Sequence, residues 1–481
     1  MESGKVECMT ALAEEGLMGS SGGLPRHPRA GRSPAQERGI MKAGMMDKVE
    51  GTGEDWTILA GGNVLAETAD RYAAGMDLWL RNGKIGRIVP PDPAEYPDEA
   101  TIVDISGKFV IPGLVDLHTH VLGFPGELDL YVRSGVTCIR DVGSLPQNTV
   151  PLRDAISSGE LQGPRIFTHG YLLDGTPEAF PGMAFSRGLA DTDDCRATIE
   201  EELELGVDGI KLLFRLKPDL VEYCLRTAKS LNLPTAGHFG EVTLDSYAVG
   251  LGIDSIEHIP PLAKDLIPEE KHAIVDENGH LLGPFRAWAE EIVFDAPEAQ
   301  RLIRLFRDSG TLLVATLTTY EVLLSQSKYV AHDPSVDQVP DEMRAMWQGY
   351  DYSELRQTDV SDVAWRGFEN CQRFAAFFFE EVGRIGIGTD APNLRTPPGI
   401  ALHRELVLLA SAGIAESDLL RSATLDACRF LGCDRDLGSL ESGKVADLIV
   451  LDKDPLQDIA HTQAIHRVFR KGQAVEPIQI P

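Results

Sequence analysis

The sequence predicts an α/β protein, a (β/α)8 TIM barrel with a small β-sandwich domain built from both ends of the chain. Two patterns predict this fold class. In the central part of the chain, short apolar segments alternate with amphipathic segments of helical period, as expected for strands joined by crossover helices. Near both ends, short apolar segments are separated by tight turns, which is typical of an antiparallel β unit.

The N-terminal 53 residues differ in composition from the rest. Residues 19–38 are dominated by Gly, Ser, Pro and Arg and show no apolar periodicity, so we expect residues 1–53 to form a disordered extension. This stretch contains no continuous apolar segment of the kind found in secretory signals. Met41, Met45 and Met46 offer later start sites, which leaves open whether residues 1–50 belong to the mature protein.

Residues 54–112 and 436–481 are predicted to form one composite β domain. Asn82-Gly83 lies between Leu80 and Ile85, and this dipeptide between apolar residues is a strong signal for a two-residue hairpin. The C-terminal segment repeats the pattern of short strands and turns. The simplest arrangement is one domain made from both ends, with the body of the chain inserted between them.

Residues 113–435 are predicted to form the barrel. The strand candidates, in order, are GLVDLHTH, TCIRDVG, RIFTHG, GIKLLF, PTAGHFG, SIEHI, LLVATL and RIGIGTDA. Helical segments between them include Asp194–Leu205, Asp219–Leu231, Ala296–Asp308, Asp362–Val382 and Ala401–Ala412. The connections 259–300 and 319–362 are unusually long, and we expect them to overhang the strand ends as lids.

The overall composition excludes several classes of protein. The chain is 43% hydrophobic and 25% charged, as in proteins that bury a large core, and it has no apolar run long enough to cross a membrane. A net charge of −29 argues against nucleic acid as a partner. Seven scattered cysteines without a CxxC pair indicate a reducing, cytoplasmic compartment. We expect a small-molecule substrate and a homo-oligomer.

The first predicted strand ends in a pair of histidines. Residues i and i+2 of a strand face the same side, so His118 and His120 would project together from its C-terminal end. Taken alone, this pair is better explained as two surface histidines on a turn. Its meaning depends on whether further ligands occur at the ends of other strands.

Further residues of metal-ligand type do occur there. His238, His258 and Asp390 end the fifth, sixth and eighth predicted strands. Lys211 lies inside an apolar strand, where an ammonium group needs a partner, a depressed pKa or a chemical modification. Barrel active sites lie at the C-terminal ends of the strands, so these side chains together predict a metal site.

These residues and the segments around them resemble the amidohydrolase superfamily. The resemblance rests on IPGLVDLHTH, Lys211, His238, the Glu-His pair of SIEHI, and GTDAP. The flanking segments VRSGVTCIRDVG, GPRIFTHG and LGSLESGKVADLIVLD resemble the subgroup of imidazolonepropionase-like proteins and metal-dependent Xaa-Pro dipeptidases. The similarity runs from about Trp56 to Val475 and leaves out the two long connections.

The resemblance implies two divalent metal ions, commonly zinc, in one site. His118, His120 and Asp390 would hold the more buried ion, and His238 and His258 the other. A carbamate formed from carbon dioxide on Lys211 would bridge them, turning a costly buried cation into an oxygen ligand. Imidazole and carboxylate ligands suit zinc, and they are also compatible with manganese or cobalt.

The resemblance also implies a reaction, which is hydrolysis of an amide C–N bond by a metal-bridging hydroxide. Asp390 would take the proton and pass it to the departing nitrogen. The substrate class that we expect is a dipeptide or an N-acyl amino acid. The alternative is a cyclic amide or amidine, as for imidazolonepropionase or the hydantoinases, and lactone or phosphotriester hydrolysis ranks below both. A non-catalytic relative is disfavoured because all six ligand positions are filled.

Four more residues are candidates for substrate binding. Tyr320 could hydrogen-bond the carbonyl oxygen, Arg215 and Arg395 could pair with a substrate carboxylate, and His169 ends the third strand. A structural role explains each of them equally well. Two further expectations concern neighbours in sequence. Arg140 forms an internal salt bridge with Asp141. Glu257 points away from the site because it alternates with His258, and it either supports a ligand from behind or has a structural role.

Overall fold

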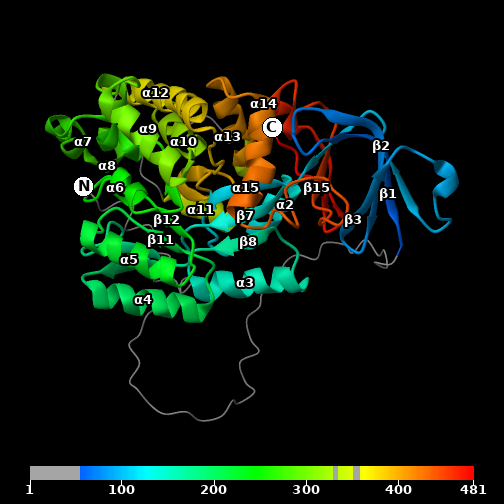
Figure 1. Ribbon diagram of the computed structural model, residues 1–481, viewed down its shortest axis with the longest axis horizontal. Coiled ribbons are helices and arrows are strands. Elements are labelled where there is room, and N and C mark those ends of the chain that lie inside the picture. The colour runs from blue at the N-terminus through cyan, green and yellow to red at the C-terminus, as the bar shows by residue number, and fades with distance from the viewer. Residues whose placement is uncertain (1–54, 329–333, 350–357, 481) are drawn as a thin grey trace, which may run out of the picture.

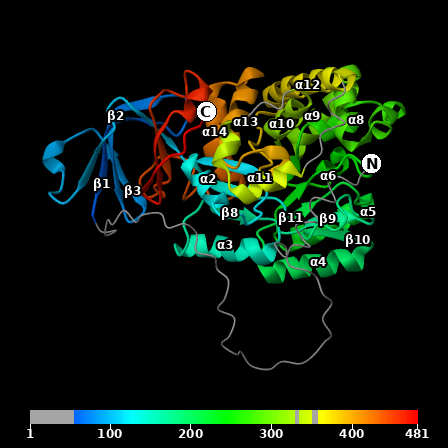
Figure 2. The same ribbon diagram turned by 180° about the vertical axis from the view of Figure 1, so that it is seen from behind.

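The computed structural model describes residues 55–328, 334–349 and 358–480. The predicted extension, residues 1–53, lies outside this part of the chain. Two regions are visible side by side, a unit made of strands from both chain ends and a larger body covered by helices (Figure 1). The view from behind shows the same division (Figure 2).

The strand-rich unit contains one sheet with strands from both ends of the chain. Its order is β17-β16-β15-β5-β1-β2-β3, with β4 paired to β1. The strands are β1 (Thr57–Leu65), β2 (Tyr72–Arg81), β3 (Lys84–Val89), β4 (Thr101–Asp104), β5 (Phe109–Pro112), β15 (Leu448–Leu451), β16 (Ile465–Arg470) and β17 (Gln473–Val475). β5 joins the two contributions because Ile111 pairs with Ile449 on one side and Phe109 pairs with Asn63 on the other.

Two turns in this sheet follow from particular residues. Asn82 and Gly83 have φ values of 51° and 74°, so the predicted hairpin between β2 and β3 is confirmed. β1 shows register shifts around Gly62, and its first half pairs with β4 whereas its second half pairs with β5. A bulge of this kind bends a strand and lets it serve two neighbours.

The body contains two parallel sheets. Three strands form the first, in the order β6 (Leu114–Thr119), β7 (Val136–Asp141) and β8 (Arg165–Thr168). Six strands form the second, in the order β10 (Ser186–Leu189), β9 (Leu172–Gly175), β11 (Ile210–Leu212), β12 (Thr235–Gly237), β13 (Ser255–Glu257) and β14 (Leu312–Val314). Seven of the eight predicted strand segments thus contain a strand, and all pairs in these sheets are parallel.

The eighth predicted segment, RIGIGTDA, connects the two sheets by isolated bridges instead of forming a regular strand. Gly386 pairs with Val314 of β14, and Ala391 pairs with Thr119 of β6. A Cβ at Gly388 would come within 2.6 Å of the Cβ of His118, so glycine is needed for this close approach. At the other edge, β8 lies in the third predicted segment and pairs with β7. β9 follows β8 in the chain and pairs with β11.

Helices cover the sheets. They are α2 (Glu127–Arg133), α3 (Pro146–Ser158), α4 (Thr192–Leu205), α5 (Pro218–Ser230), α6 (Asp245–Gly250), α7 (Ala273–Asp276), α8 (Gly279–Glu290), α9 (Pro297–Ser309), α10 (Leu317–Lys328), α11 (Asp341–Gln348), α12 (Thr358–Val382), α13 (Ile400–Ser411), α14 (Glu416–Arg421) and α15 (Ala427–Phe430). The five predicted helices correspond to α4, α5, α9, α12 and α13 within a few residues. Among the described helices, none is both long enough and apolar enough to span a bilayer.

The two long connections fold into helices of their own. The first contains α7 and α8, and α8 packs against α12 (Figure 1). The second begins with α10 and continues to α11. Pro260 and Pro284 from the first connection and Tyr320 from the second line a cavity of the body. That the connections act as lids stays a prediction.

Candidate metal centre

All six predicted metal ligands line one cavity. Its empty space is about 1250 Å³ when the open mouth is counted. His118 and Lys211 lie on strands β6 and β11, and His120, His238 and His258 directly follow β6, β12 and β13. Asp390 comes from the segment that bridges β14 and β6. Strand ends that are distant in sequence thus meet at one cavity.

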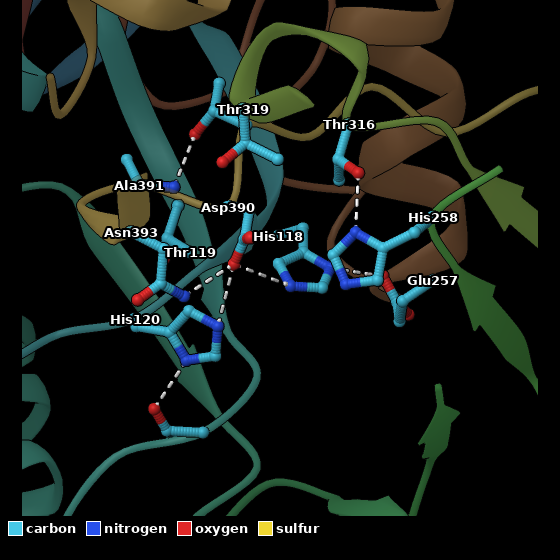
Figure 3. Close-up of polar contacts among 12 residues, drawn as sticks. His118, Thr119, His120, Glu257, His258, Thr316, Thr319, Asp390, Ala391 and Asn393 are labelled. Atoms are coloured by element: carbon cyan, nitrogen blue, oxygen red, sulfur yellow. Dashed lines mark hydrogen bonds and ion pairs between the residues drawn. The ribbon is translucent and has the colours of Figure 1, made fainter. Parts of the chain in front are cut away.

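The tightest cluster consists of His118, His120 and Asp390. One oxygen of Asp390, Oδ1, lies 3.0 Å from Nε2 of His120 and 3.4 Å from Nε2 of His118 (Figure 3). The potential ligand atoms of these three residues all lie within 4.8 Å of one another, and all three side chains are buried. Two imidazole nitrogens and a carboxylate oxygen at this spacing form a group that could hold a metal ion.

In His118, His120 and His258, the ring nitrogen Nδ1 lies within hydrogen-bond distance of a neighbouring residue. Nδ1 of His118 lies 2.7 Å from Oε2 of Glu257, and Nδ1 of His120 lies 2.7 Å from the carbonyl oxygen of Gly143. Nδ1 of His258 lies 2.6 Å from the Thr316 hydroxyl (Figure 3). Such contacts fix the orientation of a metal-binding imidazole and leave Nε2 free to coordinate.

The four histidine rings form a continuous row. Successive ring centroids are 5.5 Å apart between His120 and His118, 4.6 Å between His118 and His258, and 4.3 Å between His258 and His238. Burial lowers the pKa values of His238 and His258 well below the ordinary histidine value. Both imidazoles are therefore neutral at physiological pH, which is the form that binds metal.

Lys211 provides the test of whether a second metal and a bridging group fit. Its side chain is fully buried, and Nζ has no hydrogen-bond partner among the described residues. Burial lowers the pKa of this amine to about 8, so a nucleophilic neutral fraction is present near neutral pH. An amine of this kind can react with carbon dioxide, and the resulting carbamate oxygens would satisfy two ions better than a bare ammonium group. The residues present therefore fit a binuclear centre.

Asp390 remains ionised in spite of its surroundings. Burial by itself would raise the pKa of this carboxyl, but contacts with His118 and His120 outweigh that effect and hold the pKa well below its ordinary value. The backbone at Asp390 has a φ of 61°, a left-handed conformation that is uncommon outside glycine. Strained backbone of this kind is frequent where a functional side chain must be aimed.

Two expectations about neighbouring residues are wrong. Arg140 pairs with Glu257, with Nη2 and Oε1 2.8 Å apart, and not with Asp141, because adjacent residues of β7 point to opposite sides. Glu257 points toward the site rather than away from it, since it contacts His118. Glu257 does not itself line the cavity. The simple alternation fails because β13 ends at Glu257 and His258 has a φ of 73°, so the two residues do not follow regular strand geometry.

The four candidate substrate residues separate into two groups. Tyr320 lies on α10, lines the cavity and has its ring centroid 5.8 Å from that of His258. His169 is buried beside the site, with Nδ1 3.2 Å from the carbonyl oxygen of Ile210, and does not line the cavity. Arg215 and Arg395 do not line it either: Arg215 pairs with Glu241, and Nε of Arg395 donates to the carbonyl of Trp347.

Several residues of the site had no distinct signal in the sequence. Thr316 and Asn393 contact His258 and Asp390, and either could equally have been an ordinary loop residue. The segment between β9 and β10 supplies Phe180, Met183 and Phe185 to the cavity. Its apolar residues are scattered and without period, so nothing distinguished them from a loop that packs on the surface.

Comparisons with known proteins agree with this geometry. Residues 109–475 match the model of the amidohydrolase family. A dihydroorotase from Syntrophus aciditrophicus (strain SB) is 24% identical over 419 residues, covering 82% of this chain and 89% of that protein. An imidazolonepropionase from Legionella pneumophila (strain Paris) is 23% identical over 388 residues, covering 77% and 86%.

The fold also has a solved counterpart. A Xaa-Pro dipeptidase crystallised with bound methionine is similar over 88% of this chain and 100% of its own, with a TM-score of 0.67 and 21% identity. The family model covers most of the chain and includes every residue of the metal cluster. The chain belongs to the amidohydrolase family.

Proposed function

We propose that this protein is a metal-dependent hydrolase that cleaves the amide C–N bond of a dipeptide or an N-acyl amino acid. The observation that carries the proposal is one cavity that contains His118, His120 and Asp390 together with the amine of Lys211, which has no hydrogen-bond partner in the described part of the chain. Membership of the amidohydrolase family supports the same reaction class.

We assign the ligands as follows. His118, His120 and Asp390 would hold the more buried ion, His238 and His258 would hold the second, and a carbamate on Lys211 would lie between them. Zinc suits this set of nitrogen and carboxylate ligands. When bound, two such ions would polarise the scissile carbonyl and lower the pKa of the attacking water.

The residues of the chain itself have separable roles. Asp390 is held ionised by its histidine neighbours, so it can accept the proton of the attacking water and deliver it to the departing nitrogen. The Tyr320 hydroxyl is a donor beside His258, suited to the carbonyl oxygen of the substrate. The long connections that bear Pro260, Pro284 and Tyr320 would limit the access of water.

The proposal includes an architecture. The two parallel sheets would form a (β/α)8 barrel over residues 113–435, with 384–391 as the eighth strand and β8 and β9 as two parts of the third. The bridges from Ala391 to Thr119 and from Gly386 to Val314 support closure on one side. Residues 54–112 and 436–481 would form the β-sandwich domain, and the bend of β1 at Gly62 supports a sheet that folds back on itself.

The alternative is hydrolysis of a cyclic amide or amidine. The relative named imidazolonepropionase supports it, and the metal cluster would serve either reaction. Self-association into a homo-oligomer and a cytoplasmic location complete the proposal. Light scattering of the purified protein measures the first directly.

The test is a substrate screen of the zinc-loaded protein. Dipeptides, N-acyl amino acids and cyclic amides are incubated with the wild-type protein and with Asp390→Asn, and products are quantified by mass spectrometry. The proposal expects cleavage of linear amides by the wild-type protein alone. Cleavage restricted to cyclic amides would establish the alternative, and a protein that binds no metal and cleaves nothing would overturn the hydrolase assignment.

A further inference from the structure

The outer part of the cavity is lined by apolar side chains. We call the following six residues the apolar wall: Leu172, Phe180, Met183, Phe185, Leu213 and Phe214. They come from β9, from the segment between β9 and β10, and from the two residues that follow β11. Four of the six are buried, with relative exposures of 9% or less, whereas Phe180 and Met183 are partly exposed at the mouth.

The wall begins at a predicted metal ligand and runs outward. The ring of Phe214 packs edge-on against His238 with centroids 4.1 Å apart, and Phe180 packs edge-on against Phe214 at 5.7 Å. A substrate whose scissile bond lies at the histidine row therefore places its next group against aromatic rings. Such rings favour aromatic or bulky apolar groups.

In the described part of the chain, the histidine, lysine and carboxylate side chains that line the cavity are the six predicted metal ligands. Among the described residues that line it, Lys211 is the single lysine and no arginine occurs, and Tyr320 and Asn393 are the uncharged polar side chains. The amide of Asn393 already donates to Oδ1 of Asp390 at 2.8 Å. The described part of the wall thus contains no cation that could pair with a substrate carboxylate.

Arg215, the strongest candidate for that pairing, braces the wall from behind. Its Nε lies 3.0 Å from Oε2 of Glu241, and its Nη1 donates to the carbonyl oxygen of Glu178 at 2.9 Å. The Asp174 carboxylate accepts hydrogen bonds from the backbone of Ala179 and of Arg215, at 2.6 and 2.8 Å. These bonds attach the segment that carries Phe180 and Phe185 to the loops after β11 and β12.

We infer that the substrate presents an uncharged aromatic or bulky apolar group to the apolar wall, so that the enzyme prefers amides whose carboxylate is absent or blocked. This inference rests on the proposed cleavage of an amide C–N bond. It narrows the proposed substrate class from free dipeptides and N-acyl amino acids to derivatives whose carboxylate is absent or blocked. An N-acyl amino acid amide fits the cavity better than the corresponding free acid. A carboxylate placed against the wall loses its hydration without gaining a partner, which is strongly unfavourable.

The experiment compares matched substrates that share one scissile bond. N-acetyl-phenylalanine and N-acetyl-phenylalaninamide are offered to the zinc-loaded protein, and released phenylalanine or phenylalaninamide is measured by mass spectrometry. The corresponding alanine pair measures the aromatic preference. We expect kcat/KM for the phenylalanine amide to exceed that for the acid by on the order of tenfold or more, because the site leaves a buried charge unpaired.

Phe180→Arg is the sharpest variant, because it places a cation on the wall. It should raise kcat/KM for the acid relative to the amide by about tenfold, since a guanidinium can pair with a carboxylate. Phe294→Ala is the matched control: Phe294 is also a partly buried phenylalanine that packs on other rings, but it does not line the cavity. The control should leave the ratio unchanged.

The outcomes separate the inference from the function. Equal or faster cleavage of the free acid by the wild-type protein, with no change in Phe180→Arg, overturns the inference and leaves the amide hydrolase function intact. If neither phenylalanine substrate is cleaved, binding of both to zinc-loaded Asp390→Asn is measured by calorimetry. Tighter binding of the amide, reversed by adding Phe180→Arg, supports the inference independently of turnover, and tighter binding of the acid overturns it.

Discussion

The inner and outer parts of the cavity are built on different principles. The inner part consists of His118, His120, Lys211, His238, His258 and Asp390, which are carried by strand ends or by the segment that bridges two strands. Half of the apolar wall comes from the loop between β9 and β10. In the inner part, buried polar groups hold one another in place. In the wall, apolar side chains leave a charged ligand without a partner.

This difference assigns the chemical step to the inner part of the cavity and the choice of substrate to the apolar wall. Rigid strand ends hold ligand atoms to a fraction of an ångström, as a metal centre requires. The loop between β9 and β10 is braced by Arg215 and Asp174 and carries none of the six predicted ligands. Changes in the inner part should therefore lower kcat or metal affinity, whereas changes at the wall should alter the choice of substrate.

The largest effect is expected for Asp390→Asn. The amide cannot accept the proton of the attacking water, so kcat should fall by about 10²–10⁴-fold, the usual contribution of general acid–base catalysis. Steady-state kinetics with the best amide from the screen measures the loss, and mass spectrometry of the metals should show that part of the metal is retained. Wild-type turnover in this variant would remove Asp390 from the mechanism.

Lys211→Ala should come next. It removes the group that we place between the two ions, so at least one metal equivalent should be lost, with a decrease in rate on the order of a hundredfold or more. A short carboxylic acid in the buffer should restore part of the metal content and part of the rate. Lys444→Met is the control. Lys444 is also buried, but it hydrogen-bonds Ser439, and neither residue lines the cavity. Full metal content in Lys211→Ala would contradict the bridging role.

A smaller effect is expected for Glu257→Gln. Glu257 contacts Nδ1 of His118 and pairs with Arg140, so neutralising it should lower zinc affinity by about 10–100-fold. Competition with a chromogenic chelator measures the affinity. Glu202→Gln is matched, since Glu202 is fully buried and hydrogen-bonds the backbone of Tyr171. Equal zinc affinities of the two variants would show that Glu257 does not support the ligand.

The smallest effect is expected for Arg215→Met, which keeps the apolar stem and removes the brace behind the wall. KM for aromatic amides should rise by a few-fold while kcat changes little. The reason is that the brace supports binding of the ground state and of the transition state equally and takes no part in the chemical step. Arg226→Met is the control, since Arg226 forms an exposed pair with Glu222, and such pairs contribute little. A drop in kcat with unchanged KM would place Arg215 in the chemistry after all.

The sequence was sufficient to predict the inner part because strand geometry determines it. The period of two in β6 placed His118 and His120 on one side, and the rule that parallel strands end at one face brought His238, His258 and Lys211 to one cavity. Seven of the eight predicted strand segments and the five predicted helices lie where expected for the same reason. The period of their apolar residues matches the element that forms.

The contacts of Arg140 and Glu257 could not be predicted in this way. Sequence adjacency suggested Asp141 as the partner of Arg140, but its partner is Glu257, which lies on the other parallel sheet and is 117 residues away. The positive φ of His258 breaks the alternation that would have turned Glu257 away. Neither long-range pairing nor a left-handed residue after a strand has a local sequence signal.

The wall escaped prediction for a different reason. The side chains of Phe180, Met183 and Phe185 depend on how an irregular loop folds back over the strand ends, and irregular loops have no period to read. The two arginines expected to bind substrate lie near Lys211 and Asp390 in sequence, which was the only sequence signal for that role. In the structure, Arg215 contacts Glu178 and Glu241 instead, and Arg395 contacts Trp347.

Crystals of the zinc-loaded protein, measured at the zinc absorption edge, test the central claim most directly. We expect two anomalous peaks in the cavity, one contacting His118, His120 and Asp390 and the other contacting His238 and His258, with density for a modified Lys211 between them. A cavity without an anomalous peak, or one peak beside an unmodified Lys211, would contradict a two-metal hydrolase.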